Sequence, residues 1–131
     1  QFGSELKDSS QVFAKDSQDN LYIAGYTYGS LDGYTNQGSI DVAVSKLTSD
    51  GQIVWIRQLG TSAADAIRGM AIGDDGSVYL GGSISSNGVV IKLDSNGDEV
   101  WRDIIDPGSP SVYGQSIAIG NDGAGQFLAF V

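Results

Sequence analysis

The 131-residue sequence contains no cysteine and no histidine, and it has only two prolines. Without cysteine the chain has no disulfide bond, no thiolate nucleophile and no zinc–thiolate site. The lack of histidine removes the usual general base at neutral pH, the Ser-His-Asp arrangement and the commonest transition-metal ligand. The composition therefore argues against an enzyme, and we expect no catalytic residues.

Basic residues are also few, with seven Lys and Arg against sixteen Asp and Glu, which gives a net charge of −9. An acidic surface repels phosphate backbones and anionic lipid headgroups, so we expect no nucleic-acid partner. No run of about 18 apolar residues occurs, so no membrane insertion is expected. The sequence opens on Gln1-Phe2-Gly3 rather than on a signal peptide, which we interpret as the interior of a processed or cut polypeptide.

Glycine is abundant, at 19 residues, and Val, Ile, Tyr and Thr are spread evenly along the chain. This composition is typical of many short strands joined by tight turns. Apolar residues keep a helical spacing for no more than about two turns anywhere, and a single helical turn is expected only at Ala63–Arg68. The sequence therefore predicts an all-β fold.

The sequence also repeats itself. Gln1-Phe2-Gly3 returns as Gln58-Leu59-Gly60, 57 residues later, and Trp55 returns as Trp101, 46 residues later. The 11-residue difference falls in the loop of residues 26–37, and a third copy follows in which residues 117–123 match residues 70–76. A fixed period of this length indicates a repeat architecture. We place the repeats at approximately 1–56, 57–101 and 102–131, with the last one incomplete.

Each repeat is predicted to hold four antiparallel strands. In the second copy we expect strands at 69–72, 78–83, 89–93 and 100–105, with turns at 74–76, 87–88 and 94–98, where Asp, Asn and Gly favour tight reversals. Four strands in roughly 46 residues is the size of a β-propeller blade. The chain is thus predicted to be a single β-propeller segment, residues 1–131, of about two and a half blades.

A partial propeller of this kind cannot close into a ring alone. Its expected partners are therefore the remaining blades of a longer chain. The alternative is other protein subunits, assembled through strand edges that would otherwise invite aggregation.

Four segments carry a family resemblance. Asp41–Leu47 running into Asp50–Trp55, followed by Gln58-Leu59-Gly60 and by Asp75–Gly82, resembles the bacterial SBBP repeat, which is named for seven-bladed β-propellers. The resemblance implies secreted or cell-surface bacterial proteins in which the propeller is a scaffold or adhesion-type module, and it brings no catalytic residues. The long loop at 26–37 departs from the family's shorter pattern, as does Gly125-Gln126.

The long loop is the candidate binding site, because insertions in repeat proteins often carry binding. The residues expected to contact a ligand are Tyr26, Tyr28, Asp32, Tyr34 and Asn36. Tyrosine rings stack on sugars or on apolar side chains, while amides, hydroxyls and carboxylates supply hydrogen bonds. Two interpretations stay open, a lectin-like site for surface glycans and a long hairpin that folds onto the rim of its blade.

The turn Asp94-Ser95-Asn96-Gly97-Asp98 places oxygen ligands at alternate positions, as the start of an EF-hand loop does. The bidentate Glu of that motif does not follow at the required spacing, so we interpret the segment as a hairpin turn, with weak Ca²⁺ binding as the alternative. No other metal or cofactor is expected. Trp55 and Trp101 are expected to pack between adjacent sheets rather than to stack on a ligand.

These observations together predict a non-enzymatic, extracellular or cell-surface interaction module. The alternative is a lectin-like, carbohydrate-binding propeller that uses the 26–37 loop. An enzyme would need active residues in blades that this sequence does not contain.

Overall fold

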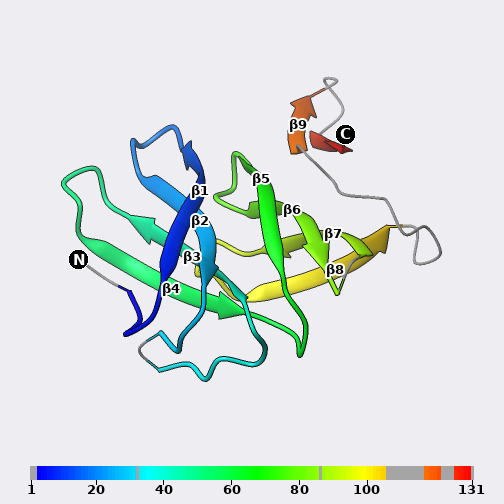
Figure 1. The fold of residues 1–131 in the computed structure, drawn as a ribbon. Coiled ribbons are helices and arrows are strands. Elements are labelled where there is room, and N and C mark those ends of the chain that lie inside the picture. Colours follow the sequence, from blue (N-terminus) through cyan, green and yellow to red (C-terminus); the bar gives the residue numbers. More distant parts are fainter. Residues whose placement is uncertain (1–2, 32, 86, 106–116, 122–125, 131) are drawn as a thin grey trace.

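The computed structural model describes residues 3–31, 33–85, 87–105, 117–121 and 126–130, which form ten strands in three antiparallel sheets (Figure 1). The first sheet holds β1 (Asp8–Lys15), β2 (Leu21–Thr27), β3 (Asp41–Leu47) and β4 (Ile53–Leu59) in chain order. The second holds β5 (Ala66–Ile72), β6 (Val78–Ile84), β7 (Asn87–Leu93) and β8 (Glu99–Ile105), again in chain order. The third pairs β9 (Ile117–Asn121) with β10 (Gln126–Phe130).

The predicted all-β fold of four-stranded blades is therefore confirmed, with two complete blades that do not close into a ring. The helical turn predicted at Ala63–Arg68 is wrong. Asp65 donates its backbone N–H to Ile40 O at 3.1 Å, and Ala66 already pairs with Ser83, so this backbone is hydrogen-bonded between strands. Among the described residues no helix is long and apolar enough to cross a membrane.

The turn predicted at residues 87–88 is also misplaced. Asn87 and Gly88 belong to β7, where they pair with Ile84 and Ser83 of β6. The chain reverses at Ser85, whose φ of 49° lies in the left-handed region. So short a reversal needs a residue with positive φ, and here that residue is a serine rather than a glycine.

Four hairpin turns share one backbone geometry. In each turn the first residue accepts a hydrogen bond from the fourth and donates one to the fifth. The fourth residue has positive φ, 86° at Gly51, 79° at Gly76 and 84° at Gly97, and 63° at Asp19. Glycine adopts this conformation without a Cβ penalty, and aspartate tolerates it, so the Gly and Asp pattern of the sequence sets these turns.

One apolar core lies between the two blades. Alternate residues of a strand point to the same face, and the first blade contributes Tyr22, Ala24, Val42 and Val44 from β2 and β3, all at most 1% exposed. The second blade contributes the buried side chains Val78, Leu80, Val89, Ile91 and Leu93 from β6 and β7. The face of the first blade that carries Tyr22 and Val44, called its front face, therefore packs on the face of the second blade that carries Leu80 and Ile91, called its back face.

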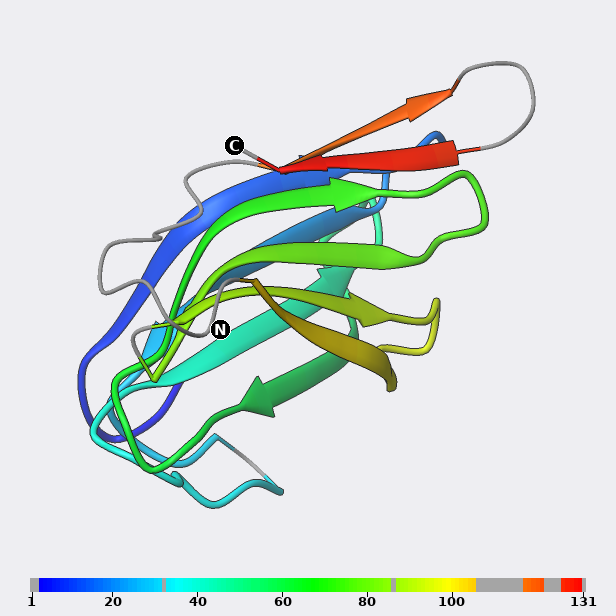
Figure 2. The same cartoon turned by 90° about the vertical axis from the view of Figure 1, so that its right-hand side faces the viewer.

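The blades are stacked in chain order, with the innermost strand of each next to the innermost strand of the following one. The innermost strand β1 contacts β5, and β5 in turn contacts β9 (Figure 2). The backbone of β9 and β10 thus begins a third blade that is stacked as the second is stacked on the first.

Candidate functional site

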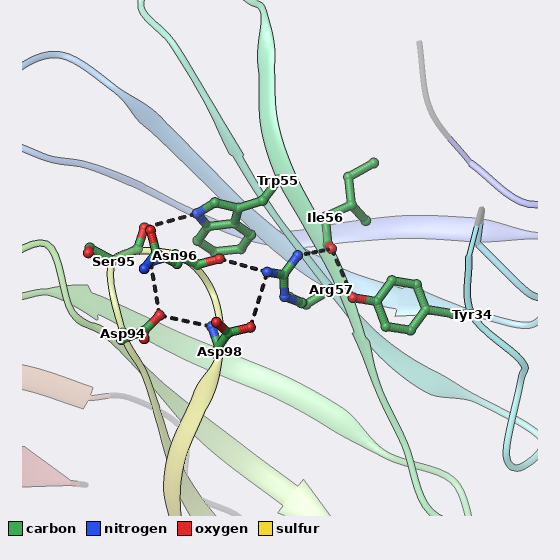
Figure 3. Close-up of polar contacts among 8 residues, drawn as sticks. All are labelled: Tyr34, Trp55, Ile56, Arg57, Asp94, Ser95, Asn96 and Asp98. Carbon is green, nitrogen blue, oxygen red and sulfur yellow. Dashed lines mark hydrogen bonds and ion pairs between the residues drawn. The ribbon is translucent and has the colours of Figure 1, made fainter.

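The junction between the two blades is closed by Trp55 of β4 (Figure 3). Its indole Nε1 donates a hydrogen bond to Ser95 O at 3.1 Å, in the β7–β8 turn of the second blade. The ring lies so close to Gly97 that a Cβ at that position would be 2.8 Å from it. Trp55 is 8% exposed, so the expectation that it packs between sheets is met by the geometry.

Arg57 holds the same turn from the next inward-facing position of β4 (Figure 3). Its Nη2 donates to Asn96 O at 2.7 Å and pairs with Asp98 Oδ1 at 3.2 Å. Its guanidinium also lies 5.7 Å from the centre of the Trp55 ring. Trp55, Arg57 and the turn of residues 94–98 are called the blade clamp below.

Asp94 shapes the turn that the clamp holds. Its Oδ1 accepts hydrogen bonds from the backbone N–H groups of Asn96 and Asp98, both at 2.9 Å. The carboxylate therefore closes a hairpin turn, as interpreted from the sequence. Ca²⁺ binding at this turn stays a prediction, and Arg57 already neutralises Asp98 there; in the described part of the chain no three acidic side chains group as metal ligands.

Each blade carries a matching row of Tyr, Lys and Trp across β2–β3–β4 or β6–β7–β8. The Tyr and Trp rings lie 6.2 Å apart in the first blade and 6.3 Å apart in the second, and the Lys Nζ lies 5.2 and 5.4 Å from the tyrosine ring. The rows are Tyr22, Lys46 and Trp55, and Tyr79, Lys92 and Trp101. The local geometry is thus repeated, but Trp101 is 38% exposed, so among the described residues the expectation that it packs between sheets is not met.

Three of the five residues predicted for the long loop lie together. The rings of Tyr26 and Tyr28 meet edge to face with their centres 5.9 Å apart. Asn36 donates from Nδ2 to Tyr28 O at 2.6 Å. Tyr28 is 37% exposed, and with Ser30 and Asn36 it lines a shallow hollow.

Tyr34, the fourth predicted residue, is not part of this group. Tyr34 turns towards β4, where its hydroxyl donates to Ile56 O at 3.2 Å (Figure 3). Asp32 lies outside the described residues. Among the described residues of the loop, Tyr26, Tyr28 and Asn36 therefore lie together, and ligand binding there stays a prediction.

Gln58 anchors the loop, and sequence reasoning missed this role. Its Oε1 accepts from Leu31 N at 2.8 Å, while its Nε2 donates to Gly29 O at 3.1 Å and to Asp41 Oδ2 at 2.8 Å. The second repeat, which has the short loop, carries Ile104 at the equivalent position. The sequence did offer a signal for this role, since glutamine occurs at this position only in the repeat with the long loop.

The corners that lead into β1 and β5 also repeat. Ser4 donates its backbone N–H to Asp8 Oδ2 at 2.7 Å, and Thr61 donates to Asp65 Oδ2 at the same distance. The hydroxyls of both residues bind the same carboxylates. Two corners that lie 57 residues apart therefore use one hydrogen-bonding device, which supports the repeat spacing found in the sequence.

The aromatic rows, hairpin turns and strand-entry corners all recur, so the chain is built of structural repeats. A comparison with family models identifies the type of repeat. Residues 54–88 match the SBBP beta-propeller repeat. The predicted SBBP resemblance is thereby confirmed over these residues. A search of curated proteins found no match to the chain.

The SBBP match runs from Val54 in β4 to Gly88 in β7, and so it includes the passage from one blade to the next. Trp55 and Arg57 of the blade clamp lie inside it, as does the Asp65 corner. The long loop of residues 26–37 lies outside the matched residues. The matched residues therefore include the β4 side of the blade clamp, but neither its 94–98 turn nor the long loop.

Proposed function

We propose that this chain is a non-enzymatic interaction module that acts by stacking its blades with further blades of a larger bacterial surface or secreted protein or assembly. The blade clamp is the observation that carries the proposal. In the clamp, a buried indole and a guanidinium of one blade hold a shaped turn of the next blade of the same chain. Buried aromatic and Arg anchors are the residues that dominate protein–protein recognition.

The extracellular or cell-surface location rests on the SBBP resemblance. It is tested by labelling intact cells of the source organism with an antibody raised against the 131-residue chain. We expect label on intact cells, and either a labelled polypeptide whose denatured mass is well above 13.7 kDa or a native assembly well above that mass. Label that appears only after the cells are lysed would overturn the location.

A lectin-like function is the second candidate, and the exposed Tyr28 beside Tyr26 and Asn36 favours it. An exposed aromatic ring with a neighbouring amide suits a sugar face and its hydroxyls. A glycan array separates the two functions, since a pure scaffold gives no glycan signal.

If the array gives a signal, Tyr28→Ala should remove it. Tyr34→Phe is the matched control, because the Tyr34 hydroxyl faces the backbone of β4 and not the Tyr26–Tyr28 pair. A signal that survives Tyr28→Ala would take the glycan site away from this loop.

A further inference from the structure

The row Tyr79, Lys92 and Trp101 of the second blade is built like the row Tyr22, Lys46 and Trp55 of the first, but no turn of a following blade lies on its tryptophan among the described residues. Trp55 and Trp101 hold the same register, opposite Lys46 and Lys92. Trp55 is 8% exposed because the β7–β8 turn lies on it, whereas Trp101 is 38% exposed. No residues of the sequence correspond to Ser95 or Gly97 in the third repeat, which reaches only its second strand, β10.

The inner half of this face is already occupied. β9 contacts β5 and β6 in the way that β5 contacts β1 and β2 (Figure 2). A second copy of the chain cannot stack a whole blade on this face, because its innermost strand would take the place of β9. Among the described residues, no strand contacts the outer half of the front face, over β7 and β8, and a two-stranded hairpin there would complete a blade with β9 and β10.

The charge beside Trp101 is opposite in sign to the charge beside Trp55. Arg57 pairs with Val44 across the first blade, and the equivalent position in the second blade, opposite Val90, is Asp103. Asp103 is exposed, and none of the chain's seven Lys and Arg residues, all of which the structure describes, lies within ion-pair distance of it. Arg57 carries a positive charge that pairs with Asp98, whereas Asp103 at the equivalent position carries a negative charge with no Lys or Arg partner in the chain.

We propose that Trp101 and Asp103 form a docking seat for the outer hairpin of the third blade, and that the turn of this hairpin carries Lys or Arg where the 94–98 turn carries Asp98. The inference rests on the proposed blade-stacking function. The β3–β4 and β7–β8 turns, which close the outer hairpins of the two blades, carry Gln52 and Asp98 at that position. A second copy would therefore bring either a neutral group or a like charge to Asp103, and like charges across an interface disfavour a wrong partner. The charge of Asp103 thus disfavours a second copy of this chain as the occupant of the seat.

The seat can be tested with the chain's own outer hairpin as the probe. The probe is a peptide of residues 87–105 with Trp101→Phe, cyclised so that the hairpin is preformed, because an isolated hairpin is marginally stable. It is made with Asp98 and with Asp98→Lys, and each form is titrated by calorimetry into the 131-residue chain and into its Asp103→Arg variant. We expect the Asp98→Lys probe to bind the unaltered chain about five- to tenfold more tightly, and we expect Asp103→Arg to reverse this preference.

Two further variants of the chain make the test specific to the seat. Trp101→Ala should abolish binding of both probes. Phe13→Ala, which removes an aromatic side chain that is 67% exposed on the opposite face of the first blade, should leave binding unchanged.

Four results would overturn the seat: no binding of either probe, equal affinity in all four combinations, binding that survives Trp101→Ala, or a dimer of the chain that Trp101→Ala dissolves. The last result would identify a second copy as the occupant. Surface labelling of cells does not depend on Asp103, so the seat and the proposed function can fail separately.

Discussion

At the scale of single residues, Trp55 and Trp101 occupy one position in two blades but lie in different surroundings. Trp55 is buried, and its indole N–H is bonded to Ser95 O, while Trp101 is 38% exposed. The contribution of an aromatic residue depends on the area that its neighbours cover and on whether its polar atom has a partner. The two tryptophans should therefore contribute unequally to stability.

Replacing each tryptophan by phenylalanine measures this difference. Trp55→Phe loses the hydrogen bond to Ser95 O and leaves part of the indole space empty, so we expect the free energy of unfolding to fall by about 1–3 kcal/mol. Trp101→Phe is the matched control and should change it by less than about 0.5 kcal/mol. Urea unfolding followed by circular dichroism gives both values, and equal losses would contradict the inequality.

The sequence predicts much at the residue scale where the cause is local. Gly51, Gly76 and Gly97 mark turns because positive φ is a property of the residue itself. The contacts of Arg57 could not be predicted in this way, because its partners lie about 40 residues away in another blade. Periodicity shows that Trp55 recurs, but only the packing of the blades shows that it rests on Ser95 and Gly97.

At the scale of elements, the long β2–β3 connection is held on its blade rather than free in solvent. Leu31 is 4% exposed, and Gln58 bonds the loop backbone at Leu31 and Gly29. Buried polar groups that lose a partner cost more than the net value of the hydrogen bond itself. Gln58 should therefore control both the order of the loop and part of the stability of the blade.

Gln58→Ala tests this role. We expect a loss of about 1–3 kcal/mol in the free energy of unfolding, because the loop backbone and Asp41 Oδ2 lose a buried partner. Amide exchange at residues 29–31 should accelerate as well. Gln52→Ala, in the exposed β3–β4 turn, is the control and should alter neither quantity. Unchanged exchange at residues 29–31 would show that other contacts hold the loop.

The strands themselves were largely predictable, since alternation of apolar residues and the turn pattern both act over a few positions. The start of β5 was not, because Ala63–Arg68 has a composition that suits a helical turn. Its backbone instead pairs with Ile40 and β6, which are remote in sequence. For the loop, composition suggested five ligand-contacting residues, but only the fold shows that Tyr34 turns towards β4.

At the scale of the whole molecule, the chain has a net charge of −9 and no histidine. No side chain with an ordinary pKa changes its charge between about pH 5.5 and pH 8. Below that range several carboxylates lie in settings that favour the ionised form. Hydrogen bonds from the backbone N–H and the hydroxyl of Ser77 hold the pKa of Asp75 below its usual value. Two hydrogen bonds from Arg102 do the same to the pKa of Glu99.

Folding also lowers the pKa of two carboxylates in the first blade. Burial alone would raise the pKa of Asp8, but the nearby Thr27 hydroxyl and the two hydrogen bonds from Ser4 outweigh it, and the pKa is lowered. For Asp16, hydrogen bonds from Asn20 and Gln18 likewise outweigh burial and lower the pKa. A carboxylate whose pKa is lowered by folding stabilises the native state above its unfolded pKa, and this contribution is lost as the pH falls through the folded pKa.

The unfolding free energy should therefore be nearly constant from about pH 5.5 to pH 8 and should fall steadily below about pH 4. Relief of repulsion among the acidic groups acts in the opposite direction, but at 0.15 M salt surface charges are screened beyond about 8 Å, so the specific hydrogen bonds should dominate. Urea unfolding at pH 8, 6, 4, 3 and 2.5 measures the profile. Asp75→Asn should flatten its acidic part, because the variant has no proton to bind at that site. A chain that becomes more stable on acidification would show that charge repulsion outweighs these hydrogen bonds.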